Sequence, residues 1–424
     1  MEKTSDISGF YNLSIEERLR ILRDFCNLTD DEVKLLKNTG ALGLDIANRM
    51  IENVIGVQHL PLGIATHFLI NGKEYFIPMA IEEPSVVAAA SYAAKLARPG
   101  GGFKAEASDS LMIGQIQIIN IKDIENAKKK IMEKKEELIK IANETNPTLI
   151  SYGGGAKDIE IREINTIRGK MLILHLIVNV ADAMGANIIN TMCEAIAKRI
   201  EDLTNGKVRL RIVSNLATKR IAKAKAIWKK DVIGEEVVEG VLDAYAFALA
   251  DEYRATTHNK GIMNGIDAVA LACSQDWRAI EAGAHAYASL SGRYLPLTKY
   301  EKDEEGNLVG EIELPLQVGI VGGATRTNEI AKIALKILGV SSAKELAEVM
   351  ASVGLAQNFA ALRALATEGI QRGHMELHAR NLAIMAGAKG NLIEKVVEIM
   401  IKDGKISFEN AKRILSEIEK SKNF

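Results

Sequence analysis

The alternation of apolar and polar residues changes its period several times between residues 109 and 216. A period of two predicts a half-buried strand, and apolar residues that recur every three or four positions predict a helix. The resulting order of strand, helix, strand, strand, helix, strand is that of a ferredoxin-like β-α-β-β-α-β unit. The predicted strands cover residues 111–119, 158–166, 170–180 and 208–213, and the predicted helices cover residues 124–142 and 187–203.

The chain on either side of this unit predicts a larger, mainly helical domain. Long Ala-rich stretches have the apolar pattern of packed helices. A β-hairpin is predicted around Asn71 and Gly72, because this dipeptide is the strongest signal for a two-residue turn. The predicted helices include residues 86–97, 237–250 and 328–338, and a further strand is predicted over residues 310–316.

Together these patterns predict an α+β protein in three parts. Residues 1–108 and 217–372 form a large domain, and residues 109–216 are the small domain inserted in it. Residues 373–424 predict a C-terminal helical flap, in which Ser407 is the N-cap of the last helix. A chain of 424 residues with 47% hydrophobic content can bury several cores.

Composition excludes several classes of protein. The net charge is -1, from 54 basic and 55 acidic residues, which argues against a nucleic-acid binder with a generally positive surface. Cys26, Cys193 and Cys273 lack CxxC spacing, so neither a disulfide framework nor a zinc ribbon is predicted. The N-terminus has no signal-peptide core, and the longest strongly apolar run, around residues 171–180, is too short to span a membrane. We expect a soluble cytoplasmic protein.

Residues 253–278 place a lysine and an aspartate among small residues. Lys260 stands in a Gly/Asn-rich stretch that predicts a turn, and Asp276 follows sixteen positions later. A lysine in such a place can stabilise a developing oxyanion, and an aspartate that reaches it would set its orientation and protonation state. Taken alone, an exposed lysine and a solvated carboxylate are the commoner interpretation.

Two further segments offer proton donors. Glu83 precedes the predicted helix 86–97, where burial would raise the pKa of its carboxyl towards neutrality. His374 follows Gly373 near the C-terminus, where it could lie on a mobile lid, although an isolated histidine is more often structural. His374 and His378 have i, i+4 spacing, but the sequence HMELH lacks the HExxH order and a third ligand group, so no metal site is predicted.

The chain has neither GxGxxG after a first strand nor GxxxxGK[ST], so neither a Rossmann fingerprint nor a P-loop is predicted. The sequence DAMGAN, residues 182–187, closes a predicted strand and opens a helix with Gly185 at the turn. Backbone N–H groups and the helix dipole could face a pyrophosphate there. Such a junction is more often simple turn chemistry, and the triple glycine at residues 153–155 is weaker support, since it could be only a flexible loop.

The motifs and their order resemble the class II hydroxymethylglutaryl-CoA (HMG-CoA) reductases over essentially the whole chain. The matching segments are ENVIG at residues 52–56, EEPSVVAAAS, DAMGANIINTMCE, THNKGIMNGID and TEGIQRGHMELHARN. The resemblance implies an oxidoreductase of the mevalonate pathway of isoprenoid biosynthesis. Its reaction would be the four-electron, reversible reduction of (S)-3-hydroxy-3-methylglutaryl-CoA to mevalonate and CoA by NADH or NADPH, without a metal.

The resemblance also implies a role for each candidate. Lys260 would stabilise the thioester oxygen, His374 would protonate the CoA thiolate, and Glu83 would protonate the aldehyde oxygen. Asp276 would hydrogen-bond within the group of Lys260 and Glu83. The resemblance implies that Ser85, Arg254 and Asn264 bind the substrate. It also implies that the dinucleotide is bound by Asp182, Ala183, Met184, Gly185, Ala186 and Asn187. Asn146 stands where NADH-preferring members of the family have an aspartate.

The family resemblance further implies a homodimer, or a hexamer that is a trimer of dimers, with the active site between subunits. HMG-CoA and mevalonate would be the small-molecule partners, and neither nucleic acid nor membrane is expected. Two alternatives remain at this point. One is a catalytically silent homologue that binds CoA or a dinucleotide as a sensor or scaffold, and the other is a reductase of a different acyl-CoA.

Overall fold

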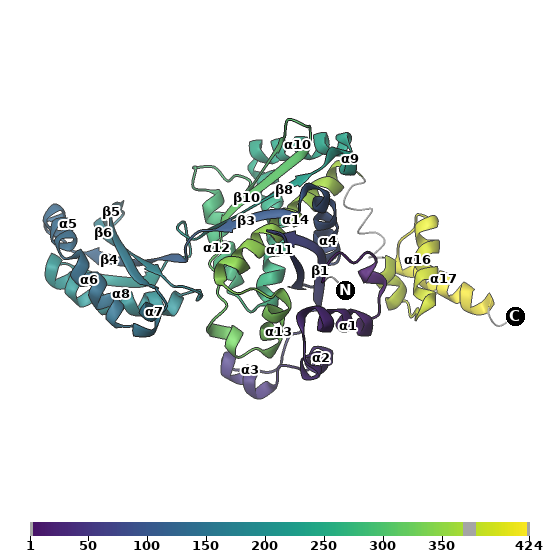
Figure 1. Ribbon diagram of the computed structural model, residues 1–424, viewed down its shortest axis with the longest axis horizontal. Coiled ribbons are helices and arrows are strands. Elements are labelled where there is room, and N and C mark those ends of the chain that lie inside the picture. Colours follow the sequence, from purple (N-terminus) through teal and green to yellow (C-terminus); the bar gives the residue numbers. More distant parts are fainter. Residues whose placement is uncertain (1–2, 368–378, 422–424) are drawn as a thin grey trace.

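The computed structural model describes residues 3–367 and 379–421, and its strands form two separate sheets (Figure 1). The larger sheet has six strands in the order β2-β1-β3-β8-β10-β9, and the smaller has four in the order β5-β6-β4-β7. The small sheet and its helices lie at one end of the molecule, and the C-terminal helices α16 (Asn391–Lys402) and α17 (Phe408–Ser421) lie at the other. Both sheets are accompanied by helices, so the predicted α+β class is confirmed.

The small sheet has the predicted β-α-β-β-α-β order, with all neighbouring strands antiparallel. Its helices pack on one another and on the sheet around a core that includes Ile116, Leu174 and Ile196. The predicted single helix over residues 124–142 is wrong in one respect: it is interrupted at Lys134, whose φ and ψ of −106° and 14° break the helical geometry. The elements are β4 Leu111–Ile119, α5 Ile124–Glu133, α6 Lys135–Glu144, α7 Pro147–Ser151, β5 Gly155–Thr166, β6 Gly169–Asn179, α8 Ala186–Thr204 and β7 Lys207–Val213.

The large sheet begins with the predicted hairpin. Asn71 and Gly72 have φ values of 52° and 81°, as a type I′ turn requires. Charged and apolar residues alternate along β3, β8 and β10, so one face packs on helices while the other meets solvent. The strands are β1 Leu62–Ile70, β2 Lys73–Ala80, β3 Phe103–Ala107, β8 Ile221–Trp228, β9 Thr298–Lys302 and β10 Leu308–Pro315.

The helix at the centre of the large domain is α14, Ala343–Ala366. By length and composition alone it could cross a membrane, since an 18-residue window within it has a mean hydropathy of 1.3. In the folded chain 67% of that apolar window is buried, and Phe359 stacks on Trp228 of β8 at 3.9 Å between ring centroids. Its apolar residues therefore form the core of the domain.

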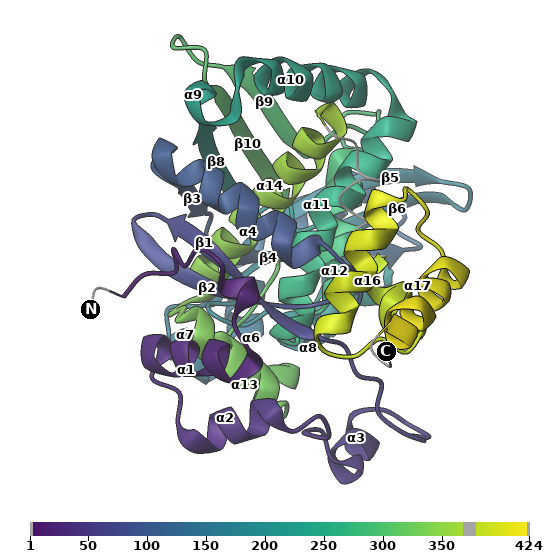
Figure 2. The same ribbon diagram turned by 90° about the vertical axis from the view of Figure 1, so that its right-hand side faces the viewer.

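Other helices surround this core, and Figure 2 shows α4 and α11 beside α14. The C-terminal helices have an apolar cluster of their own, which includes Leu382, Val396 and Ile414. Ser407 caps α17 as predicted, by accepting a hydrogen bond from the N–H of Asn410 at 3.2 Å. The remaining helices are α1 Ile15–Cys26, α2 Asp30–Lys37, α3 Leu44–Met50, α4 Val86–Ala97, α9 Lys230–Ile233, α10 Glu235–Ala250, α11 Glu252–Ala272, α12 Trp277–Ala288, α13 Glu329–Leu338, α16 Asn391–Lys402 and α17 Phe408–Ser421, with short 3-10 turns at Phe10–Asn12, Arg98–Gly100 and Gly323–Arg326.

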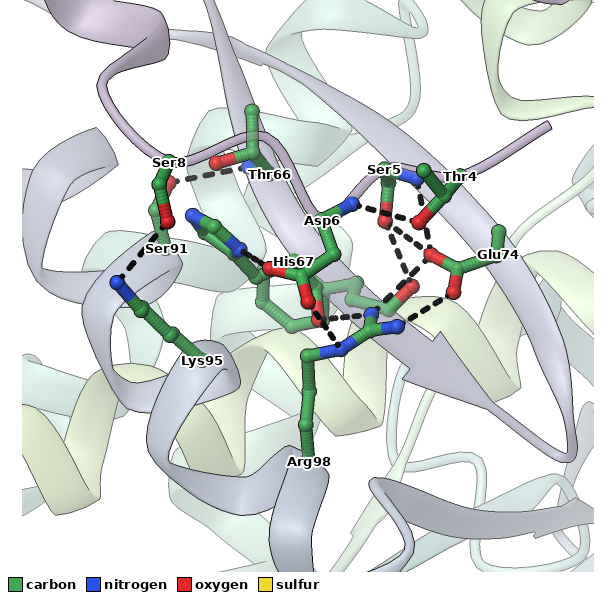
Figure 3. A network of polar contacts seen from close by, with 11 residues as sticks. Thr4, Ser5, Asp6, Ser8, Thr66, His67, Glu74, Ser91, Lys95 and Arg98 are labelled. Atoms are coloured by element: carbon green, nitrogen blue, oxygen red, sulfur yellow. Dashed lines mark hydrogen bonds and ion pairs between the residues drawn. The ribbon is translucent and has the colours of Figure 1, made fainter. Parts of the chain in front are cut away.

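A polar network clamps the N-terminal segment onto β1 and the end of α4 (Figure 3). Arg98 is paired with Glu74 at 2.6 Å and with Asp6 at 3.3 Å. His67 has a φ of 67° at an irregularity of β1, and its Nδ1 lies 2.6 Å from Asp6 Oδ1. Ser5 donates its hydroxyl to Glu74 at 2.6 Å. The network thus fixes the end of α4 opposite to Glu83 and Ser85.

Acidification is expected to weaken this clamp. Burial disfavours the charged Glu74 carboxylate, but the hydrogen bonds from Arg98 and Ser5 outweigh that effect and lower its pKa from 4.5 to about 2. Burial lowers the pKa of His67 below 6.5, against the opposing effect of Asp6. Both groups bind more protons in the unfolded chain than in the folded chain, so lowering the pH decreases the stability of the fold. The loss begins at about pH 6.5 for His67 and occurs between about pH 5 and 2 for Glu74.

Urea unfolding at several pH values tests this expectation. Glu74→Gln should lower the free energy of unfolding at pH 7 and should reduce the further loss between about pH 5 and 3. Glu311→Gln, which removes an exposed carboxylate paired with Lys225, is the matched control. Its free energy of unfolding should depend on pH as that of the native chain does. Identical pH dependence for Glu74→Gln and the native chain would show that the clamp does not act in this way.

Candidate active site

Lys260 and Glu83, two candidates of opposite charge, lie next to each other. The Nζ of Lys260 is 3.0 Å from Oε2 of Glu83, although the residues are 177 positions apart in the chain. Their side chains remain 59% and 38% exposed, so a substrate could reach both. Our expectation that Glu83 is buried is wrong, because it lies at the open start of α4 beside the lysine.

Lys260 lies in the middle of α11 and not in the turn that its Gly and Asn neighbours predict. The helix begins at a strong cap, since the Asp251 side chain accepts a hydrogen bond from the N–H of Arg254 at 2.7 Å. Apolar residues such as Ile262 and Ile266 are fully buried against the core of the domain. This packing outweighs the weak local preference of glycine and asparagine for turns.

The three predicted substrate-binding residues lie on the same two elements as the ion pair. Ser85 begins α4 in the left-handed conformation, with a φ of 75°, and its hydroxyl is buried without a partner among the described residues. Arg254 is half-buried in the first turn of α11, where burial lowers the pKa of its guanidinium. Asn264 follows Lys260 by one turn on the same side of α11. A buried hydroxyl without a partner is costly, and a ligand could supply one.

The DAMGAN segment forms a tight turn between β6 and α8. Gly185 has a φ of 100° and precedes α8 without a side-chain cap, and a Cβ at this position would come within 2.4 Å of Val180. The glycine is therefore required, and no side-chain cap covers the first N–H groups of α8. Asp182 is tied to the large domain, because its Oδ1 accepts a hydrogen bond from the N–H of Ala343 at 2.8 Å. This turn fits an anionic ligand.

The sequence model of the hydroxymethylglutaryl-coenzyme A reductases matches residues 14–379. This chain belongs to the HMG-CoA reductase family. The 3-hydroxy-3-methylglutaryl-coenzyme A reductase of Archaeoglobus fulgidus is 63% identical over 98% of this chain and 95% of its own length. The probable reductase of Borreliella burgdorferi is 38% identical over 88% of each chain.

Solved structures agree with this membership. The class II HMG-CoA reductase of Streptococcus pneumoniae, described as bound to NADPH in open conformations, is 41% identical. It superposes with a TM-score of 0.81 and covers 96% of this chain and 100% of its own. A second structure of the reductase from that species has a TM-score of 0.83 over 97% and 99% of the two chains. The class II resemblance predicted from the motifs is confirmed.

Asp276 does not contact the pair of Lys260 and Glu83 in the way we expected. It is the N-cap of α12, where its Oδ1 accepts a hydrogen bond from the N–H of Ala279 at 3.1 Å. The same oxygen lies 3.2 Å from Arg278. No hydrogen bond among the described residues joins Asp276 to the pair, because the cap commits this oxygen to α12. Its catalytic role remains a prediction.

Gly373, His374 and His378 lie outside the described residues. The segment that follows them is described from Ala379 onward, and Arg380 pairs with Glu394 there at 2.5 Å. Within residues 3–367 and 379–421, no group of three His, Cys, Asp or Glu side chains is arranged to hold a metal ion.

Asn146, which the family match aligns a few residues before the triple glycine, has a structural task in the fold. It is the N-cap of α7, and its Oδ1 accepts a hydrogen bond from the N–H of Leu149 at 2.9 Å. The glycines are not simply a flexible loop. A Cβ at Gly154 would come within 2.5 Å of Leu149, and one at Gly155 within 2.3 Å of Ile150, so α7 packs directly on this loop.

The sequence analysis missed a buried polar network behind α11. His258 is 1% exposed, and its Nε2 lies 2.6 Å from the hydroxyl of Thr298, which in turn donates to Asn358 at 3.1 Å. Burial and the nearby charge of Arg254 lower the pKa of His258 to about 3, so the ring is neutral at pH 7. The sequence signal for a buried His258 was its i, i+2 spacing from Lys260, which places the two residues on different sides of a helix. The network holds α11 in position while Lys260 faces outward.

Proposed function

We propose that this chain reduces (S)-3-hydroxy-3-methylglutaryl-CoA to mevalonate and CoA. Its family membership makes it an oxidoreductase, and NADH or NADPH would supply two hydrides. The observation that carries the proposal is the accessible pair of Lys260 and Glu83 at 3.0 Å, on the same elements as the unpartnered hydroxyl of Ser85. A cation beside a carboxyl group is what reduction of a carbonyl needs, since negative charge develops on oxygen while a proton must be delivered.

Lys260 would hold the thioester oxygen while negative charge develops on it. Glu83 would then exchange a proton with the aldehyde oxygen during the second reduction. Release of the CoA thiolate requires another proton, which we assign to His374, because imidazole titrates near neutral pH. Asp276 would act on the pair after a rearrangement or through the substrate, since its Oδ2 has no hydrogen bond among the described residues.

The distal carboxylate of the substrate would be held by Arg254, because guanidinium binds carboxylate through paired hydrogen bonds. Ser85 and Asn264 would bind the substrate through their polar side chains. Ser85 supports this assignment most directly, since its buried hydroxyl lacks a protein partner among the described residues.

The dinucleotide would lie on the turn formed by Asp182, Ala183, Met184, Gly185, Ala186 and Asn187. The N–H groups at the start of α8 would hold its pyrophosphate. NADPH is named for the Streptococcus pneumoniae reductase of the same fold, which supports this choice of ligand. We also assign thioester binding to residues 1–108 and 217–372, dinucleotide binding to 109–216, and the flap to 373–424.

A homodimer in the cytoplasm, or a hexamer built of three such dimers, completes the proposal. Ile51, which precedes the ENVIG motif, and Ile55 within it are 65% and 103% exposed in the single chain. Exposed apolar side chains of this kind are common at subunit interfaces. Light scattering should show at least a dimer, and an active monomer would contradict the assignment.

The activity is tested by following absorbance at 340 nm with HMG-CoA and either NADH or NADPH. We expect oxidation of the dinucleotide together with release of CoA. Acyl-CoA esters without a distal carboxylate should react far more slowly, because Arg254 would have no partner. No reaction with either dinucleotide would refute the proposal, and equal rates on esters without the carboxylate would refute the substrate assignment.

Asn146→Asp is expected to shift the preference of the enzyme towards NADH. Aspartate preserves the cap on α7 and adds a negative charge that repels the 2′-phosphate of NADPH. The ratio of kcat/KM for NADH over NADPH should rise by roughly tenfold, equivalent to about 1.4 kcal/mol. Asn146→Ser retains a capping oxygen without charge and should leave the ratio near its native value. An unchanged ratio in Asn146→Asp would show that this residue does not face the ribose.

A further inference from the structure

Arg220 is a buried cation in the connection between the two sheets. It lies immediately before β8, where the chain returns from the small sheet to the large one, and it is 5% exposed. Its guanidinium donates hydrogen bonds to the carbonyl oxygens of Ala183 and Met184 at 3.1 and 3.2 Å. It also donates to the carbonyl of Val318 in the large domain at 2.5 Å. One side chain therefore joins the DAMGAN turn to the large domain.

Other contacts fix the same turn. The N–H of Ile320 donates to the carbonyl of Asp182 at 2.9 Å, and Asp182 accepts from Ala343 through its side chain. A Cβ at Gly319 would come within 2.5 Å of the nitrogen of Met184, so glycine allows the backbones to approach this closely. The position of the turn relative to α11 and Lys260 thus depends on contacts with the large domain.

The charge of Arg220 is not neutralised by an ion pair among the described residues. Burial lowers the pKa of its guanidinium to about 10, while the charge of Asp182 opposes this effect. The group therefore remains charged at pH 7. A buried charge whose hydrogen bonds go only to carbonyl groups is costly, and it attracts an anion more strongly than an exposed charge does.

The orientation of the turn follows from the same hydrogen bonds. In a planar trans peptide the C=O and N–H point in opposite directions. Since Arg220 binds the carbonyls of Ala183 and Met184, the N–H groups of Met184 and Gly185 point away from the guanidinium. The side chain fixes the direction of backbone donors in the turn, next to the uncapped start of α8.

We propose that Arg220 is a positioning residue for the dinucleotide, which holds the DAMGAN turn against the large domain and places a positive charge behind its pyrophosphate site. This inference rests on the proposed function. It predicts that Arg220 affects binding of the dinucleotide and not binding of the thioester.

Calorimetric titration with ADP-ribose, a redox-inert ligand that carries the pyrophosphate, tests the inference without reference to turnover. Arg220→Met should raise the Kd for ADP-ribose by about twentyfold or more. Arg220→Lys keeps the charge but loses the paired donors, so its Kd should rise by about fivefold. The Kd for HMG-CoA should remain within about twofold in both variants, because that site lies on other elements. Lys219→Met, which removes the adjacent surface charge paired with Glu160, should bind both ligands normally.

Salt dependence separates the electrostatic role from a purely structural one. Between about 50 and 500 mM NaCl, binding of ADP-ribose should weaken less steeply in Arg220→Met than in the native chain and in Arg220→Lys. Equal loss of both ligands, or native ADP-ribose binding in Arg220→Met, would overturn the inference. If Arg220→Met does not fold, native binding by Arg220→Lys would overturn it. Failure of the native protein to bind ADP-ribose, NADH or NADPH would instead contradict the proposed function.

Discussion

Replacing Lys260 by alanine is expected to lower kcat for HMG-CoA by about 10²–10³, the usual effect of losing one donor to an oxyanion. Lys260 lies 3.0 Å from Glu83 and is 59% exposed, so its charge is available to a substrate oxygen. The lysine acts on charge that develops during reduction, and the Kd for HMG-CoA should change much less than kcat. Stopped-flow or steady-state measurement at 340 nm would provide both parameters.

Lys225→Ala is a matched control for this experiment. Lys225 is also a surface lysine of the large domain, 49% exposed and paired with Glu311 at 2.8 Å. Its loss should leave kcat unchanged, because surface ion pairs contribute little to stability. If Lys260→Ala retained a kcat near that of Lys225→Ala, the assignment of the oxyanion cation would be wrong.

Removing residues 373–424 is expected to abolish turnover while the rest of the protein still folds and binds the dinucleotide. The described part of this segment has its own apolar cluster, which includes Leu382, Val396 and Ile414, and the core around α14 is formed by other residues. The truncated chain would lack His374, and general acids typically contribute about 10²–10⁴ to a rate. Circular dichroism and titration with NADPH would establish folding and binding.

The single substitution His374→Ala distinguishes the proton donor from the rest of the segment. It should slow reduction of the thioester much more than reduction of free mevaldehyde, which has no thiolate to protonate. His378→Ala removes an imidazole from the same segment and should affect neither substrate strongly. Equal losses on both substrates in His374→Ala would mean that the histidine has another role.

The parts of the fold that could be predicted from sequence are those with a strong local signal. The hairpin at Asn71 and Gly72 needs two positive φ values that few other residues adopt easily. The small sheet was predicted because the period of its apolar residues changes clearly at each element. The break at Lys134 left no such signal, since charged residues occupy both sides of it.

The candidate site, in contrast, is determined mainly by contacts between distant segments, which local sequence patterns do not predict. The contact of Lys260 with Glu83 joins segments 177 residues apart, so only the family resemblance could bring them together in advance. Glycine and asparagine near Lys260 favoured a turn, but the buried face of α11 imposes a helix. The hydrogen bonds of Arg220 and Asp182 across the two domains could not be predicted either, because no local pattern specifies contact between distant loops.

The stoichiometry of the reaction tests most directly whether one site carries out a four-electron reduction. Limiting HMG-CoA is incubated with excess NADPH, and NADPH oxidised, CoA thiol released and mevalonate formed are measured in the same sample. We predict two molecules of NADPH oxidised for each molecule of CoA and of mevalonate. Oxidation of one NADPH per CoA with mevaldehyde as the end product, or no oxidation with either dinucleotide, would contradict the claim.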